Sequence, residues 1–154
     1  MTSAQRRYLA TEAAIGATIS AVLSIGFVLL MFGHLNRVAI AGTSGLIVDA
    51  VPQGAAIALM ATLVPTLLTR RRLALGKVCP VPQAGPGRVS HLPVRALAMA
   101  ATGAAITTAL TAMLLVAGIA DLPLAAVLAG KTIWGLLLGG VVAWTMTHAA
   151  IEQR

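Results

Sequence analysis

The chain has 154 residues, of which 58% are hydrophobic and only 10% are charged. A soluble domain carries about a quarter charged residues, so this composition argues against a water-soluble fold and favours an integral membrane protein. The formal net charge of +7 comes from cations that flank apolar segments, and no long basic run is interleaved with aromatics, which argues against nucleic-acid binding.

The first apolar run, residues 13–33, contains no charged residue. At 1.5 Å per residue a helix of this length spans about 30 Å, the thickness of the hydrocarbon core. The run is far longer than the apolar region of about 7–15 residues in a signal peptide, so we expect a permanent transmembrane helix. Glu12 stands at its entry, where a carboxylate suits the positive end of the helix dipole. We expect it to pair with an arginine at the end of the second run rather than to couple ions.

The second run, residues 46–69, is the most informative stretch because it places polar residues and prolines in an apolar segment. A carboxylate such as Asp49 costs several kcal/mol in lipid unless it is paired or hydrated. Pro52 removes a backbone donor beside it, and Gln53 needs an interhelical partner, which we expect to be a Ser or Thr of the first or third helix. The run is predicted to stop at three arginines, which also suit contact with anionic lipid: Arg70, Arg71 and Arg72.

Residues 73–95 are rich in Pro and Gly and are basic, which indicates a flexible linker. The third apolar run, residues 96–120, is again free of charge. A tight turn is predicted at residues 121–123. The fourth run, residues 124–147, contains Lys131.

Lys131 lies one residue past Gly130, and Gly130 aligns with Gly45, so Lys131 and Asp49 fall at a similar depth. One interpretation is an ion pair that binds the two halves of the chain together. The alternatives are a proton- or cation-coupling site and simple exposure at the interface. With Pro52 and Gln53, these two residues form the candidate polar intramembrane site.

The first and third runs align with Gly16 over Gly103, and the second and fourth runs align with Gly54 over Gly139. Further matches in these alignments are Ala17 with Ala104, Ser20 with Thr107, Ser24 with Thr111, Ala58 with Ala143 and Thr62 with Thr147. The pattern predicts a duplicated helical hairpin, whose copies are related by an axis along the membrane normal. We therefore expect an all-α, four-helix membrane bundle with hairpins at 1–72 and 96–154, joined by the linker 73–95.

Small residues recur at four-residue spacing on two of the predicted helices, which is typical of close helix packing in membranes. These helix-packing candidates are Gly16, Ser20 and Ser24 on the first helix and Gly135, Gly139 and Ala143 on the fourth. The contacts can form within the bundle or between protomers.

The distribution of cations predicts the orientation of the chain. The N-terminal segment, the linker region and the tail hold nine cations: Arg6, Arg7, Arg70, Arg71, Arg72, Lys77, Arg88, Arg95 and Arg154. The other two connections hold only Arg37. The positive-inside rule therefore places both termini and the linker in the cytoplasm, and we expect a multi-pass protein of a bacterial inner membrane.

No metal, cofactor or catalytic site is predicted. Cys79 is the only cysteine, which excludes an intramolecular disulfide and any multi-cysteine zinc or iron–sulfur site, and no His or Asp lies at motif spacing from it. His34, His91 and His148 fall at different levels, which argues against a haem held by two histidines.

The first half also carries a recognisable pattern. Ser20 and Ser24 lie on the first helix, Pro52 lies on the second, and Pro65 opens a Pro-Thr-Leu-Leu sequence that runs into the arginines. This pattern, covering mainly residues 13–72, resembles small bacterial two-helix membrane proteins of a family without assigned function. The resemblance implies a fold and no activity.

These observations predict a non-enzymatic membrane protein of structural or accessory type. It would act through helix contacts with itself or with a larger membrane complex. The alternative is a subunit of a small oligomeric transporter or channel, with Asp49, Gln53 and Lys131 lining a polar path.

Overall fold

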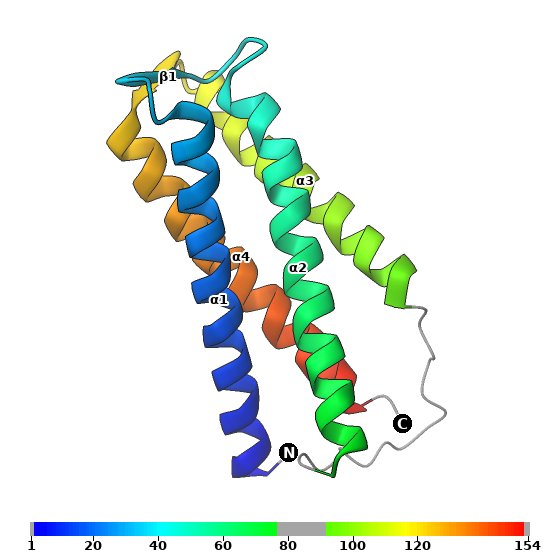
Figure 1. The fold of residues 1–154 in the computed structure, drawn as a ribbon. Helices are drawn as coiled ribbons and strands as arrows, with labels where there is room; N and C mark the ends of the chain where they lie inside the picture. The colour runs from blue at the N-terminus through cyan, green and yellow to red at the C-terminus, as the bar shows by residue number, and fades with distance from the viewer. Residues whose placement is uncertain (1, 77–91, 153–154) are drawn as a thin grey trace.

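The computed structural model describes residues 2–76 and 92–152, which form four helices and two short strands. The elements are α1 (Ser3–Phe32), β1 (Arg37–Ala39), α2 (Leu46–Ala74), α3 (Leu92–Val116), β2 (Asp121–Pro123) and α4 (Leu124–Glu152). The helices pack together, and each contains a stretch long and apolar enough to cross a membrane, which confirms the expected all-helical, four-helix architecture. α1 begins and α4 finishes at one end of the bundle, the terminal end, and the strands lie at the opposite, sheet end (Figure 1).

α1 begins ten residues before the apolar run that predicted it, because its first turn has a capping box. The Thr2 hydroxyl accepts a hydrogen bond from the Gln5 backbone N–H at 3.3 Å, and the Gln5 side-chain oxygen accepts one from the Thr2 N–H at 2.8 Å. The two residues thus satisfy backbone donors that a helix start leaves open.

The other three helices also differ from their predicted limits, and α3 ends at Val116, before the predicted limit at position 120. α2 continues through the arginines, which were predicted to stop it, and ends at Ala74, since cations in a last turn suit the negative end of the helix dipole. α3 begins inside the predicted linker at Leu92, with Pro93 in its first turn, where a missing N–H is tolerated. α4 runs past position 147 to Glu152. Cys79 and His91 lie outside the described residues.

The prediction of a tight turn at residues 121–123 is wrong, because these residues form β2. β2 pairs with β1 in an antiparallel sheet, with Val38 opposite Leu122. The Ile40 N–H extends the pairing by donating to the Ala120 carbonyl at 2.9 Å. Two connections at the same end of a bundle can satisfy each other's backbone groups in this way. Under the sheet lies a buried apolar cluster of Val28, Phe32, Val38, Ile40, Leu46 and Val127.

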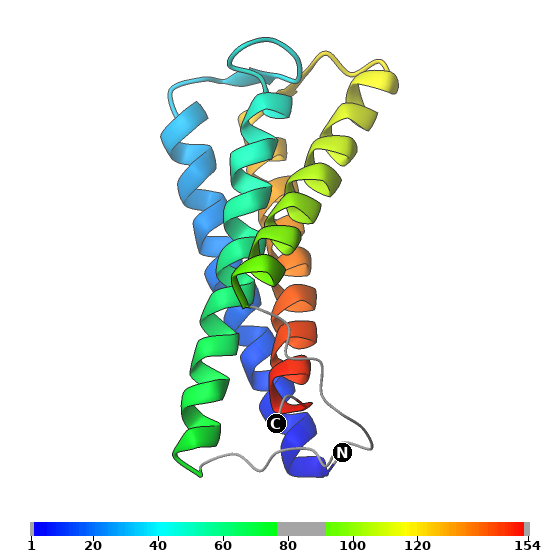
Figure 2. The ribbon, with the colours of Figure 1, turned by 90° about the vertical axis from the view of Figure 1, so that its right-hand side faces the viewer.

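The helices pack mainly across the two predicted hairpins rather than within them. α1 packs on α4, α2 packs on α3, and α2 also contacts α4, whereas α1 and α2 touch only sparsely. α3 crosses α2 obliquely and begins well short of the terminal end (Figure 2). The two hairpins therefore interlock, and neither forms a packing unit of its own.

Close contacts between small residues hold the α1–α4 and α2–α3 seams together. A Cβ added to Gly16 would lie 2.5 Å from the Cβ of Ala143, and one added to Gly103 would lie 2.6 Å from the Cβ of Ala58. Gly139 packs against Ser20 in the first seam. Gly135 packs against Ser24 in the same α1–α4 seam. In the α2–α3 seam, Gly54 packs against Thr107. Under the alignment of the two halves, the contacts that Gly16, Gly139 and Ala143 make in the α1–α4 seam thus correspond to contacts in the α2–α3 seam.

The bundle carries polar residues inside and large apolar residues outside. Its buried polar residues are Gln5, Glu12, Ser20, Ser24, Asp49, Gln53, Thr62, Thr66, Thr69, Thr107 and Thr147. Large apolar side chains such as Leu30, Leu97 and Val116 are 67–89% exposed. Water-soluble proteins bury such side chains and rarely expose large continuous apolar surface.

Candidate functional site

The structure brings together three of the four residues of the predicted polar site. Asp49 lies in the first turn of α2 and is buried, and Lys131 lies in the second turn of α4. The Lys131 ammonium forms an ion pair with Asp49 Oδ2 and donates to Gln53 Oε1 at 2.6 Å. The side chains of Asp49 and Lys131 are 3% and 12% exposed. The pair predicted from their similar depth is present, and it joins the two halves of the chain.

Helix geometry explains which residues reach this site. Asp49 and Gln53 are four positions apart on α2, so they lie one above the other on the same face, toward α4. Pro52 lies on the exposed face and does not enter the site, contrary to the prediction that grouped it there. The expected Ser or Thr partner of Gln53 is replaced by Lys131, because α2 packs on α4 at this level.

The surroundings of the ion pair are largely apolar. The Lys131 ammonium lies 5.6 Å from the centre of the Phe32 ring, within the range of a cation–π contact. The carboxylate and the ammonium neutralise each other, and Gln53 supplies a further acceptor. This arrangement can hold two helices together, and it can exchange a proton or an ion only if water or a ligand reaches it.

A cavity of about 220 Å³ lies beside Lys131 and is lined mainly by α3 and α4, with one residue each from α2 and β2. Its lining is apolar except at Lys131, Trp134 and the hydroxyls of two threonines: Leu46, Thr107, Leu110, Thr111, Leu114, Leu122, Val127, Gly130, Lys131 and Trp134. The Trp134 indole N–H donates to the Thr107 hydroxyl at 3.0 Å, which fixes the indole ring at the cavity wall. Sequence reasoning missed Trp134. The alignment of the two halves could have indicated it, because it sets Trp134 opposite Asp49.

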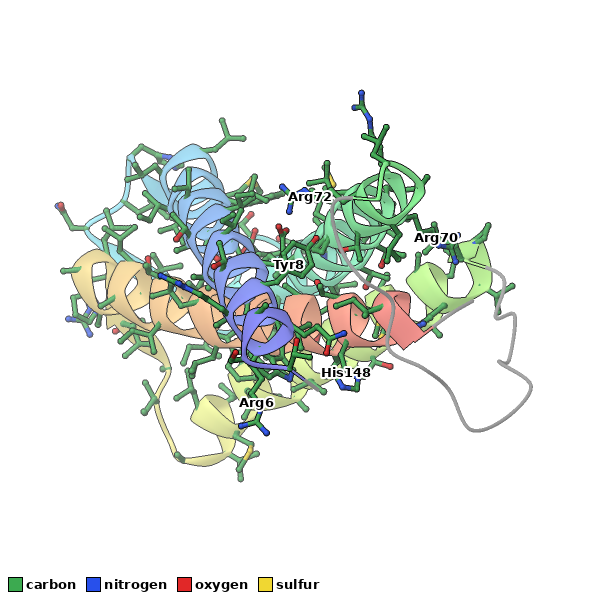
Figure 3. The ribbon with its side chains drawn as sticks, turned by 90° about the horizontal axis from the view of Figure 1, so that it is seen from below. Arg6, Tyr8, Arg70, Arg72 and His148 are labelled. Atoms are coloured by element: carbon green, nitrogen blue, oxygen red, sulfur yellow. The ribbon has the colours of Figure 1, made fainter. Side chains whose placement is uncertain are left out.

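A second polar cluster lies at the terminal end, between α1 and α2. Arg72 forms an ion pair with Glu12, as predicted for one of the three arginines, and donates to the Tyr8 hydroxyl at 3.2 Å. The Tyr8 hydroxyl is also hydrogen-bonded to the Thr69 hydroxyl at 3.0 Å. Tyr8 and Arg72 lie in the space between the two helices, whereas Arg70 lies on the side of α2 toward α3 (Figure 3). Arg72 is therefore engaged with Glu12 and Tyr8, while its side chain stays 38% exposed.

A third ion pair, which sequence reasoning missed, joins Arg37 of β1 to Asp121 of β2. Both side chains are well exposed, at 62% and 44%. The hydrogen bond from the guanidinium to Asp121, and secondarily the charge of the carboxylate, raise the pKa of Arg37 above its ordinary value. Arg37 thus stays charged across the physiological range of pH.

The two described histidines lie at opposite ends of the fold. His34 is in the turn after α1 at the sheet end, and His148 is on α4 at the terminal end. Among residues 2–76 and 92–152, no three His, Cys, Asp or Glu side chains gather as a metal-binding group.

Comparison with protein-family models, curated proteins and solved structures finds no match for this chain. The resemblance to small bacterial two-helix membrane proteins therefore stays a prediction.

Proposed function

We propose that the chain is an integral membrane protein whose four helices all cross the bilayer, with the terminal end in the cytoplasm. Four spans return the chain to the side where it started, in keeping with α1 beginning and α4 finishing at the same end. Polar residues buried inside the bundle and large apolar side chains exposed on its outside suit lipid as the surrounding solvent. The cations concentrated in the N-terminal segment, the linker and the tail favour the cytoplasmic side of a bacterial inner membrane for that end.

Within this membrane, the protein acts as a non-enzymatic structural or accessory component through helix contacts with itself or with a larger membrane complex. One observation carries this proposal: the interior charges are neutralised inside the chain. Lys131 pairs with Asp49, and Arg72 pairs with Glu12. A static bundle requires such closed pairs, because an unpaired buried charge is strongly destabilising.

The structure also bears on which surface meets a partner. The stripes at Gly16 on α1 and Gly139 on α4 are occupied by contacts within the chain. Contacts with a second copy or another membrane protein are therefore made by the outer apolar faces, for example around Leu30 of α1 or Leu97 of α3.

The proposed duplication of a helical hairpin rests on the equivalence of the two seams. Gly16 meets Ala143 as Gly103 meets Ala58, and Gly139 meets Ser20 as Gly54 meets Thr107. The sequence alignment of the two halves matches the residues of both sets. The shared α2–α4 contact lies where the axis relating two such hairpins would run.

The second candidate function is a subunit of a small oligomeric transporter or channel. The cavity beside Lys131 and the buried Asp49–Gln53–Lys131 group favour it, because ionisable residues in membrane spans often mark ion pathways. A bundle of four helices encloses too little space for a pathway of its own, so this function requires more than one copy.

Two experiments test these proposals. Reporter fusions at both termini and in the sheet-end connections are expected to place only the termini in the cytoplasm; the opposite pattern would refute the orientation. For the function, purified protein in liposomes is expected to leave proton and cation flux at the level of empty liposomes. A wild-type flux that Asp49→Asn abolishes would overturn the structural role in favour of transport.

A further inference from the structure

The Lys131 ammonium has a hydrogen-bonding capacity that residues 2–76 and 92–152 do not fill. An ammonium carries three N–H donors. Two acceptors face it among the described residues, Asp49 Oδ2 and Gln53 Oε1. Lys131 also lines the cavity of about 220 Å³ between α3 and α4. A largely buried charged donor beside a cavity calls for an acceptor from outside the chain.

The charges restrict the chemistry of that acceptor. Asp49 already neutralises Lys131, and within the described part of the chain no second cation lines the cavity. A full anion would therefore add an unbalanced negative charge to a low-dielectric site, whereas a neutral carbonyl oxygen would accept the remaining N–H without that penalty. The rest of the occupant must be apolar, because five Leu and Val side chains form most of the wall.

The size of the cavity and its depth in the bilayer further restrict which molecules can occupy it. At about 220 Å³ it is smaller than the roughly 300–1,000 Å³ pockets that hold drug-sized molecules, so it suits a segment of chain rather than a bulky ring system. α4 has 29 residues and is about 44 Å long, which exceeds a hydrocarbon core of about 30 Å by about 7 Å at each end. Lys131 lies about 10 Å along α4 from Leu124, just inside the boundary where lipid ester groups lie.

We propose that the cavity beside Lys131 binds a glycerophospholipid of the sheet-end leaflet. An ester carbonyl of the lipid accepts a hydrogen bond from Lys131, and the adjoining part of the acyl chain packs between α3 and α4 on Leu110, Leu114 and Val127. This inference rests on the proposed membrane insertion. Its test is made in detergent solution, so a failed topology and a missing lipid site give different results.

Trp134 lines the cavity and reports its occupancy. In a Trp144→Phe protein it is the only tryptophan, because the chain has two. A phosphatidylethanolamine with brominated ester-linked chains is expected to quench its fluorescence. Unlabelled ester lipid should displace the brominated lipid at an about tenfold lower concentration than the ether lipid with the same headgroup and chains, since a hydrogen bond from a charged donor contributes at least that factor.

Two single variants and one double variant test whether the quenching comes from lipid bound in this cavity. Leu114→Phe, which fills the cavity, should weaken quenching, whereas Leu137→Phe on the exposed face of α4 should not. Asp49→Asn combined with Lys131→Met removes both charges together and should abolish the preference for ester over ether lipid. Equal displacement by the two lipids, equal effects of the two phenylalanine variants, or displacement by a lipid-soluble quinone but not by ester lipid would each overturn the proposal.

Discussion

The two halves of the chain share their packing contacts and differ in their polar chemistry. Gly16 and Gly103 make equivalent close contacts in the α1–α4 and α2–α3 seams. The alignment sets Asp49 opposite Trp134, however, and the ion pair between Glu12 and Arg72 lies within the first half. Small residues at a seam are constrained by the approach of two backbones, whereas charges need only a partner at the right depth. The two seams therefore have equivalent packing, whereas the charges are distributed unequally between the halves.

The largest effect is expected from breaking the charge pair that joins the halves. Lys131→Met leaves the Asp49 carboxylate buried without a counter-ion and should lower the free energy of unfolding by about 3–5 kcal/mol. Denaturant titration in mixed micelles measures this change. Asp49→Asn combined with Lys131→Met should recover most of the loss, because no charge is then left unpaired. A single variant as stable as the wild type would show that the pair does not hold the halves together.

The seams offer a direct test of equivalence between the halves. Gly16→Val and Gly103→Val each force a side chain into space already filled by an alanine and should each destabilise by about 1–3 kcal/mol. Gly26→Val is the control on α1, because nothing lies within 4 Å of a Cβ there, and it should be close to neutral. If only one of the two seam variants were destabilising in the same titration, the seams would not be equivalent.

A smaller effect is expected at the ion pair confined to the first half. Glu12→Gln removes the charge that faces Arg72, but the arginine is 38% exposed and keeps its hydrogen bond to Tyr8. The expected loss of stability is about 1 kcal/mol, read from the same micelle titration. Arg71→Gln, at the exposed neighbouring arginine, should change nothing. A loss of stability as large as that of Lys131→Met would mean that the burial of Glu12 alone determines the loss, whatever the exposure of its partner.

The smallest effect is expected at the exposed pair between the strands. Arg37→Ala should leave the unfolding midpoint unchanged within error, since exposed ion pairs are screened by water and salt. Thermal unfolding in detergent at low and at high salt is the measurement. A marked loss at low salt that disappears at high salt would show that this pair, too, helps to join the halves.

Much of the fold and part of the site could be predicted from residue patterns. Long apolar runs predicted all four helices, and aligned glycines predicted the depth match between Asp49 and Lys131. The helix ends were less predictable, because capping at Thr2 and the continuation of α2 past Arg72 depend on local hydrogen bonds and dipoles. The role of Trp134 was missed, because its partner Thr107 lies on α3 and the sequence does not show which helices pack against α3.

The sequence by itself determined the number of helices, their apolar character and the small residues that allow close packing, because each of these is a local property of composition and spacing. Only the tertiary structure decided which helices pair. α1 lies on α4 and α2 on α3, so that the hairpins interlock and Pro52 faces outward. Helix pairing depends on contacts between residues more than 40 positions apart, such as Ala58 and Gly103. An amphipathic signal is weak when lipid-facing and buried residues are both apolar.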